Sequence, residues 1–296
     1  MKMRAAEITI PTAMVRQLVN NQFPRWADLP LVSVLSSGTD NARFRLGDAT
    51  VVRLPRIRRA VEAVLRDQAW LATIGRHLST VKVPTPMALG DPSADYRHNW
   101  SVDDWLDGDL AREGHVQNLA HLVREIAAFP DVLRKMPVKD APATGRSLPA
   151  LRARMRATVI AAAGLVDSNA VPRVWDHALA QGNWAVPLVW LHGDLAPGNL
   201  LLQGGHLTGV IDFSALGLGD PSQDLRMAWN LHPASARADF APKIQVDAPT
   251  ILPACRRALA QAMFQFPYDH ISNRVLAAQA RNVIAEVPAE PPGGMI

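Results

Sequence analysis

The chain has 296 residues, of which 48% are apolar and 20% charged, so we expect a packed core in one large domain or in two lobes, and global disorder is excluded. The net charge is +4, but the basic residues are scattered among acidic ones except for a cluster from Arg53 to Arg59, which argues against nucleic-acid binding. With no apolar run long enough to span a membrane, no secretory signal pattern and Cys255 as the sole cysteine, we expect a cytoplasmic protein.

The first part of the chain alternates short apolar runs with turn residues. Its pattern predicts a helix over 11–20 and strands over 31–35, 42–46 and 50–54. These strands are joined by short turns, which predicts an antiparallel meander. The loop after the first strand holds Ser37, Gly38 and Thr39, whose small side chains allow backbone N–H groups to approach phosphates. An ordinary hairpin turn is the alternative for this loop.

The middle of the chain is mainly helical in pattern. Apolar residues at helical spacing predict a long helix over 58–77, followed by a loop-rich stretch over 82–95 and a strand pair around 95–105. Further helices are expected over 115–129, 147–163 and 172–181, with an irregular loop over 130–145 and a short buried strand over 187–191. The last ten residues are expected to be a frayed tail.

Acidic and amide side chains are concentrated in the segment LHGDLAPGNLLLQGGHLTGVIDFSALGLGDPSQD, which runs from Leu191 to Asp224. Two apolar runs joined by two glycines predict a β-hairpin, and its closure brings Asn199 and Asp212 together. Two such oxygen ligands suit Mg²⁺. Asp194, five residues before Asn199, lies where a carboxylate can accept the proton of a hydroxyl group. These residue types are the ones that phosphoryl transfer requires.

The spacing H-x-D-x-x-x-x-N, followed by an apolar residue and D-F, resembles the catalytic and metal-binding segments of kinase-like phosphotransferases. The longer form HGDLAPGN…IDFSALGLGDPSQDL resembles the aminoglycoside phosphotransferase family, which includes macrolide and other small-molecule kinases. The resemblance implies an α+β, two-lobed protein-kinase-like fold. A small lobe over residues 1–100 would hold an antiparallel sheet and one helix, and a large, mostly helical lobe would span 101–296.

The same resemblance assigns roles in nucleotide binding. Arg53 takes the place of the strand lysine that holds phosphates in kinase-like folds, and Asp67 that of the helix acid that orients it. Arginine is bulkier than lysine, which leaves open the choice between ATP and GTP. For Asp67, a surface residue paired with Arg66 or Arg76 is the alternative. Backbone groups around Trp100 and Val102 would face the adenine.

Around the predicted catalytic Asp194, three further residues are expected to act as supports. His192 has no second histidine at metal-ligand spacing, so we expect it to fix the loop by hydrogen bonds. Asp220, followed by a proline, is expected to cap the next helix, and the resemblance implies that Asp224 braces the catalytic loop.

The sequence therefore predicts Mg²⁺-dependent transfer of the γ-phosphoryl group of ATP or GTP to a hydroxyl group of a small molecule. The acids near the C-terminus are matched by basic residues, so an aminoglycoside, a macrolide and a metabolite alcohol all remain candidate acceptors. The alternative is a kinase-like protein that binds nucleotide without turnover. A serine hydrolase is excluded by the absence of G-x-S-x-G, and a glycosidase leaves Asn199 unexplained.

Overall fold

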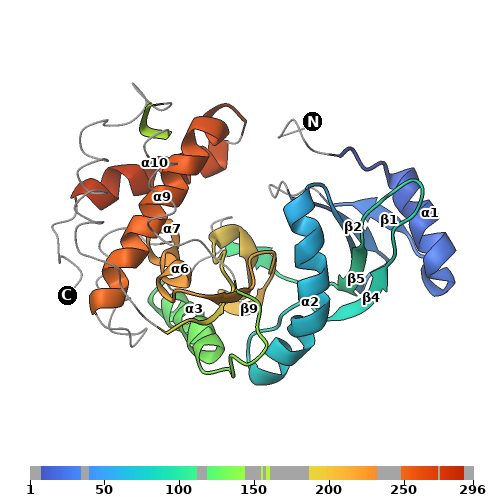
Figure 1. The fold of residues 1–296 in the computed structure, drawn as a ribbon, viewed down its shortest axis with the longest axis horizontal. Helices are drawn as coiled ribbons and strands as arrows, with labels where there is room; N and C mark the ends of the chain where they lie inside the picture. The colour runs from blue at the N-terminus through green and yellow to red at the C-terminus, as the bar shows by residue number, and fades with distance from the viewer. Residues whose placement is uncertain are drawn as a thin grey trace.

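Figure 1 shows the computed structural model of the chain, which describes residues 8–34, 40–111, 119–143, 155, 158–160, 187–231, 248–272 and 274–289. The predicted phosphate loop with Ser37, Gly38 and Thr39 lies outside these residues. So do the helix expected over 172–181 and most of the one expected over 147–163. Among the described helices, none combines the length and apolarity of a membrane-spanning segment.

The N-terminal part is built on a five-stranded antiparallel sheet with the order β1-β2-β3-β5-β4. The strands are β1 (Leu31–Ser33), β2 (Asn41–Leu46), β3 (Thr50–Pro55), β4 (Pro86–Gly90) and β5 (Trp100–Asp104). The predicted meander forms β1 to β3. The stretch expected to be loop-rich, 82–95, contains one strand that the sequence did not predict, β4. Pro86 is tolerated there as the first residue of an edge strand, and pairing with β5 outweighs a weak local signal.

The two faces of this sheet differ in chemistry because side chains alternate along each strand. One face carries Phe44, Val52 and Val102, which pack into a core with α1 (Thr12–Gln22) and the short 3-10 helix η1 (Pro24–Trp26). The opposite face carries Arg43 and Arg53, which are register partners on β2 and β3, together with Ser101 and Asp103 of β5. The sheet therefore presents a charged face away from its apolar core.

Helix α2 (Arg58–His77) has the bounds that the sequence predicts, and it lies between the sheet and the C-terminal part in Figure 1. Its second half, with Leu71 and Ile74, packs into a second core that is built mainly from the C-terminal part. After α2, the Lys82 N–H donates to the carbonyl of Thr208, and the Lys82 carbonyl accepts from the N–H of Val210. The helix thus ties the sheet to the region that carries the predicted catalytic segment.

The C-terminal part combines short strands with helices. It comprises β6 (Asp109–Leu110), α3 (Leu119–Arg134), β7 (Val189–Leu191), η3 (Pro197–Asn199), β8 (Leu200–Gln203), β9 (His206–Val210), β10 (Gly217–Gly219), α6 (Ser222–Leu225), α7 (Met227–Leu231), α9 (Ala248–Ser272) and α10 (Arg274–Ala289). Helix α3 continues past Pro130, where the sequence predicted a loop, because Leu133 in its last turn is fully buried. Helix α10 likewise extends to Ala289, into the stretch expected to be frayed.

The predicted hairpin is formed by β8 and β9. Its two-residue turn, Gly204-Gly205, has φ angles of 57° and 83°, which only glycine adopts without strain. Strand pairing opposes Leu200 to Val210, so the residues just outside the strands, Asn199 and Asp212, flank the open end of the hairpin. The hairpin joins a sheet in the order β6-β8-β9, while β10 pairs with β7.

Candidate active site

The loop from His192 to Asn199 connects β7 to the hairpin. Within it, the side-chain amide of Asn199 donates to the backbone carbonyl of Asp194 at 2.8 Å, which leaves the amide oxygen of Asn199 as the acceptor end of that side chain. The carbonyl of Asn199 accepts from the N–H of Ile211 at 2.9 Å. These two bonds bring the loop that carries Asp194 against the residue preceding Asp212.

His192 links the same two segments through hydrogen bonds of its ring. Its imidazole is fully buried, and its Nδ1 accepts a hydrogen bond from the Asp194 N–H at 3.1 Å. The Nε2 atom therefore carries the hydrogen and donates to the carbonyl of Ile211 at 3.1 Å. The ring also packs edge-on against Phe213, with 4.5 Å between centroids. His192 thus has two loop contacts and packs in the core.

Asp224 holds the start of the loop. Its two carboxylate oxygens accept the backbone N–H groups of His192 and Gly193 at 2.8 and 2.7 Å. Burial raises the pKa of Asp224, although nearby His192 and the two backbone donors oppose that effect. Two backbone donors on one buried carboxylate make a rigid joint between α6 and the loop.

Asp220 contacts α6 and α9 instead of the loop. One carboxylate oxygen accepts from the Ser222 N–H at 2.9 Å, and the other lies 2.8 Å from Nη2 of Arg257 on α9. Burial alone would raise the pKa of Asp220, but Arg257 and the hydrogen bonds lower it. The expected capping contact is present, while α6 begins only at Ser222 and has Pro221 at its N-cap position.

The Asp194 carboxylate is fixed by an arginine that the sequence analysis did not single out. Nη2 of Arg226 lies 2.7 Å from Oδ1 of Asp194 and also donates to the carbonyl of Gly193 at 2.8 Å. The Asp194 side chain is 40% exposed, whereas that of Arg226 is 10% exposed. A buried cation therefore orients a carboxylate that remains accessible to solvent.

Gly193 allows the loop to approach the segment after Asp212. Its φ is 83°, and a Cβ atom at this position would lie 2.3 Å from the carbonyl oxygen of Ala215. No side chain larger than hydrogen fits there without movement of the backbone. The close approach keeps the loop and the Asp212 segment in register.

Asp212 has a strained backbone conformation and a largely buried side chain. Its φ is 65°, an uncommon value for a residue other than glycine, and its side chain is 15% exposed. Oδ2 lies 2.6 Å from Nη2 of Arg43, and Oδ1 is buried without a hydrogen-bond partner among the described residues. Burial would raise the pKa of Asp212, but Arg43 and Arg53 lower it to about 2.

These groups fit a hard divalent cation. Asp212 Oδ1 is an orphaned anionic oxygen, and the side-chain oxygen of Asn199 flanks the same end of the hairpin. Mg²⁺ takes few protein ligands and keeps water or phosphate oxygens in its remaining positions. The donor set is thus of the right chemistry and number for Mg²⁺.

Arg53 lies at the centre of a buried charge network on the polar face of the sheet. Its Nη2 is 2.6 Å from Asp67 on α2, and its Nε is 3.5 Å from Asp103 on β5. Burial alone would lower the pKa of Arg53, but the two carboxylates raise it, while burial raises the pKa of both Asp67 and Asp103. Asp67 is fully buried, so the alternative of a surface residue paired with Arg66 or Arg76 is wrong.

Trp100 and Val102 do not fit the role expected of them. Both side chains are fully buried in the apolar core of the sheet. Their strand, β5, lies between β3 and β4, with Val102 opposite both Val52 and Ala88. The strand hydrogen bonds occupy the backbone groups that were expected to face a nucleotide, which is a correction to the sequence analysis.

The structure therefore brings Asp194, Asn199 and Asp212 together and pairs Arg53 with Asp67. His192 and Asp224 make hydrogen bonds to the backbone of the loop that carries Asp194. Sequence reasoning missed Arg43, Asp103 and Arg226. Ser101 and Asp103 lie two positions apart on β5, so their side chains share one face of the strand. A search for polar residues at every second position would have found this signal. For Arg43 there was no local signal, because 169 residues separate it from Asp212.

The fold is that of kinase-like phosphotransferases. It resembles the GDP complex of wild-type aminoglycoside 2'-phosphotransferase-IIIa, with a TM-score of 0.73 at 16% identity over 95% of this chain and 99% of the other. It also resembles the apoenzyme of macrolide 2'-phosphotransferase MphH from Brachybacterium faecium, with a TM-score of 0.61 at 21% identity over 93% and 98% of the two chains. These similarities confirm the predicted two-lobed α+β class.

A family model described as the Phosphotransferase enzyme family matches residues 32–259, and the chain belongs to this family. Over 158 residues it is 34% identical to an aminoglycoside 3'-phosphotransferase of Streptomyces fradiae, which is 49% of this chain and 58% of the relative. Identity to an aminoglycoside 3'-phosphotransferase of Escherichia coli is 28% over 42% of this chain and 46% of the relative. The chain spans about half the length of the curated relatives it matches. The family resemblance inferred from the motifs is confirmed.

Proposed function

We propose that the chain transfers the γ-phosphoryl group of ATP or GTP to a hydroxyl group of a small molecule, in a reaction that depends on Mg²⁺. The observation that carries this proposal is the convergence of Asp194, Asn199 and Asp212. Asn199 donates a hydrogen bond to Asp194 and accepts one from Ile211, the residue before Asp212, which holds the three positions near one another. The family supports the same chemistry.

In this proposal Asp194 orients the acceptor hydroxyl and takes its proton as the new bond to phosphorus forms. Arg226 holds one oxygen of that carboxylate at 2.7 Å, so the other is directed toward the acceptor. Asn199 and Asp212 hold Mg²⁺, which when bound supplies positive charge against the phosphate oxygens. His192 and Asp224 keep the loop rigid, which fixes the distance between base and metal ligands.

The phosphates would meet arginines rather than a lysine. Arg53 is only 8% exposed and already contacts Asp67 and Asp103, so it acts mainly by its charge. Arg43 is 18% exposed and bound to Oδ2 of Asp212, beside the oxygen Oδ1 that would hold Mg²⁺, so its charge would act on phosphates bound there. Arginine forks suit phosphate oxygens.

The test is nucleotide turnover with Mg²⁺ over a panel of aminoglycosides, macrolides and simple alcohols. Asp194→Asn is expected to lower kcat by about 10²- to 10⁴-fold with the acceptor that gives turnover, while nucleotide affinity is kept. Asp104→Asn is the matched control and should keep full turnover, because this carboxylate at the end of β5 accepts a hydrogen bond from the Thr85 N–H. Turnover unaffected by Asp194→Asn would refute the assignment.

The competing function, nucleotide binding without turnover, is motivated by the arginine at position 53 and by its two carboxylate partners. Calorimetry with Mg²⁺ and nucleotide separates the two. Tight binding with no phosphorylated product from any acceptor would favour the binding protein over the enzyme.

A further inference from the structure

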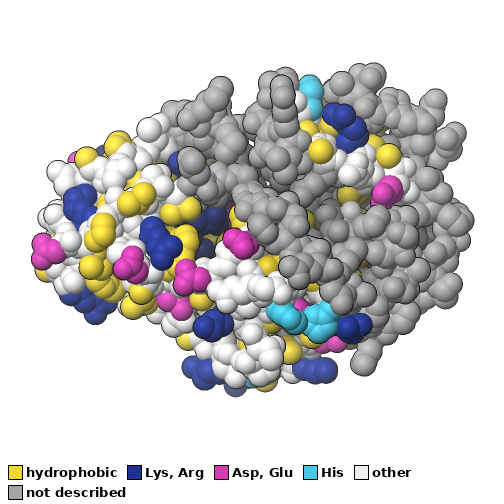
Figure 2. Space-filling view, turned by 180° about the vertical axis from the view of Figure 1, so that it is seen from behind, with side chains coloured by type: hydrophobic (Ala, Val, Ile, Leu, Met, Phe, Trp, Pro, Cys, Tyr) yellow, Lys and Arg dark blue, Asp and Glu magenta, His cyan; other side chains and the backbone are white. Residues whose placement is uncertain are grey.

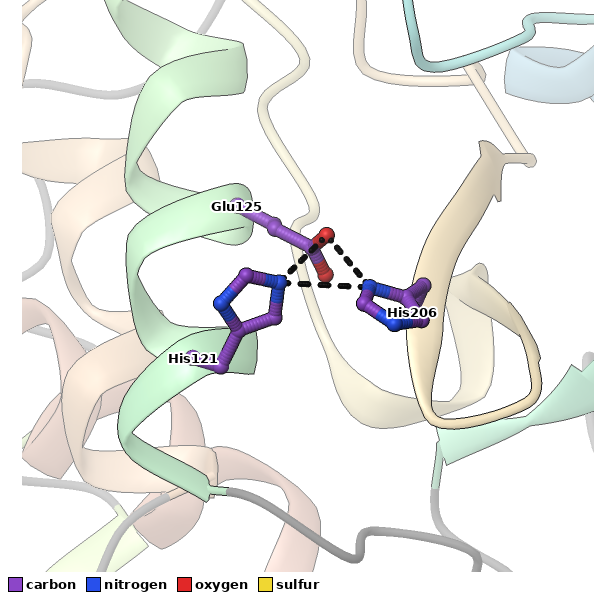
Figure 3. A group of neighbouring side chains, drawn as sticks. All are labelled: His121, Glu125 and His206. Atoms are coloured by element: carbon purple, nitrogen blue, oxygen red, sulfur yellow. Dashed lines mark hydrogen bonds and ion pairs between the residues drawn. The ribbon is translucent and has the colours of Figure 1, made fainter.

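A second group of metal-ligating side chains lies on the surface, away from the residues discussed so far. His121 and Glu125 lie four positions apart, on one face of α3, and His206 begins β9. Figure 3 shows the three side chains pointing toward one point between the helix and the hairpin. Within the described ranges this is the one group of three or more histidine, cysteine or acidic residues with converging ligand atoms.

The three ligand atoms form a nearly equilateral triangle. Nε2 of His121 is 3.1 Å from Oε1 of Glu125 and 3.2 Å from Nδ1 of His206, and the remaining edge from His206 to Glu125 is 3.0 Å. Ligands bound to a tetrahedral Zn²⁺ at about 2.0–2.1 Å are separated by about 3.3 Å. Opening each edge by a few tenths of an ångström is therefore enough to admit the ion.

Hydrogen bonds alone cannot satisfy this triangle. If Nε2 of His121 and Nδ1 of His206 both carry a hydrogen, these two hydrogens point at each other. If only one nitrogen carries a hydrogen, one of the three edges lacks a donor. A cation at the centre accepts one lone pair from each of the two nitrogens and the carboxylate oxygen, so that no two lone pairs or hydrogens face each other.

The carboxylate is already positioned for this use. Oε2 of Glu125 accepts the backbone N–H of Leu207 at 2.9 Å, which turns Oε1 toward the two rings. Burial would raise the pKa of Glu125, but the Leu207 N–H and the neighbouring histidines lower it, so the group is ionised at neutral pH. Carboxylates that bind a metal through one oxygen commonly accept a hydrogen bond that fixes their orientation.

The site is accessible from solvent. The side chains of His121, Glu125 and His206 are 37%, 24% and 60% exposed. In the space-filling view of Figure 2, histidine side chains lie together on the surface in the lower part of the view. Exposure on one side leaves room for a water molecule as the fourth ligand.

We propose that His121, Glu125 and His206 bind one divalent transition-metal ion, with Zn²⁺ as the preferred ion and water as the fourth ligand. Two imidazoles and one carboxylate suit Zn²⁺ and exclude Mg²⁺, which prefers oxygen ligands. The ion fastens the turn end of the β8–β9 hairpin to α3. The opposite end of that hairpin carries Asn199 and Asp212, so the two metal sites are separate.

One contact opposes the ion in the metal-free chain. Nη2 of Arg124 lies 3.2 Å from Nδ1 of His121, and a guanidinium can only donate, so it faces a ring nitrogen without hydrogen. When Nε2 binds a metal, Nδ1 carries the hydrogen instead, and the exposed Arg124 side chain must move away. Arg124→Gln is therefore expected to tighten metal binding by a few-fold.

The test is calorimetric titration of the full chain with ZnCl₂ after chelation, with any histidine tag removed and Mg²⁺ in excess. We expect one Zn²⁺ per chain, and a rise in Tm of roughly 4 °C at a free Zn²⁺ concentration about 100 times the Kd. His206→Ala and Glu125→Gln should each weaken binding at least tenfold. His77→Ala is the control, because His77 is exposed on α2 and its Nδ1 lies 2.9 Å from the Thr73 carbonyl one turn earlier in its own helix.

Co²⁺ provides a second measurement that does not depend on the stability of the variants. The wild-type chain with Co²⁺ should show the strong visible absorption of a tetrahedral site, and His206→Ala should lose it. Because the His206 side chain is mostly exposed, the Tm of this variant without metal should match the wild type. Equal Zn²⁺ affinity in wild type and His206→Ala, or no saturable Zn²⁺ binding, would overturn the proposal.

Discussion

Nη2 of Arg43 on β2 lies 2.6 Å from Oδ2 of Asp212, so a cation from the N-terminal sheet occupies the carboxylate that we propose as a magnesium ligand. The side chains are only 18% and 15% exposed, which strengthens the interaction relative to a surface pair. The contact joins the sheet directly to the end of the β8–β9 hairpin. It also means that Mg²⁺ at Oδ1 and Arg43 at Oδ2 would share one carboxylate charge, so that the arginine competes electrostatically with the metal.

This competition predicts that Arg43→Gln lowers the Mg²⁺ concentration needed for half-maximal turnover by several-fold. Arg45→Gln is a matched control, because Arg45 lies on the same strand but binds the backbone of Gly47 and Asp48. The measurement is turnover against Mg²⁺ concentration at saturating nucleotide. An unchanged or higher Mg²⁺ requirement in Arg43→Gln would show that Arg43 does not compete with the metal.

The same ion pair makes stability depend on pH. The folded-state pKa of Asp212 is about 2, below the ordinary value of 3.8, so its contribution is fully present above about pH 4 and is lost as the pH falls toward 2. A shift of this size corresponds to about 2 kcal/mol. The difference in free energy of unfolding between wild type and Asp212→Asn should shrink by that amount between pH 5 and pH 2. A difference independent of pH would contradict it.

Arg226 is expected to act through the position of Asp194 rather than through nucleotide binding. Arg226→Gln removes the 2.7 Å contact and should lower kcat by about 100-fold while leaving the KM for nucleotide within a few-fold of wild type. Arg226→Lys restores the charge without the fork and should recover part of the loss. Equal changes in kcat and nucleotide KM would indicate a general disturbance of the fold instead.

Gly193 and Gly204 offer a matched pair of substitutions. Both have positive φ, at 83° and 57°, but a Cβ on Gly193 would meet the Ala215 carbonyl oxygen at 2.3 Å, whereas nothing lies within 4 Å of one on Gly204. Gly204→Ala should cost about 1 kcal/mol, for the left-handed backbone alone. Gly193→Ala should cost at least about 3 kcal/mol because the backbone must shift. Equal losses in chemical denaturation would mean that the loop can relax.

The buried network around Arg53 should matter more for stability than any surface pair. Asp67→Asn leaves a buried guanidinium short of a partner 2.6 Å away and should cost about 3 kcal/mol in free energy of unfolding. The control is Asp107→Asn at the exposed pair with Arg45, 3.9 Å apart, where at most about 0.5 kcal/mol is expected. A small loss in Asp67→Asn would mean that Asp103 alone compensates the charge of Arg53.

Much of the fold could be predicted because its signals are local. Helix α2 follows from apolar residues at helical spacing over 58–77, and the β8–β9 hairpin from two apolar runs joined by Gly204-Gly205. The helix that continues past Pro130 and the strand at Pro86 were missed because their own residues disfavour them. Burial of Leu133 and pairing with β5 outweigh those local preferences.

The sequence by itself determined the loop, the hairpin and the spacing of Asp194, Asn199 and Asp212, since these depend on residues close together along the chain. Only the tertiary structure decided which cations meet these acids. Arg43 reaches Asp212 because strand register places it on the polar face of the sheet, and α2 buries Asp67 against Arg53. It also decided that Trp100 and Val102 face the core. Charges distant in sequence are paired by the packing of elements, and no local pattern encodes that packing.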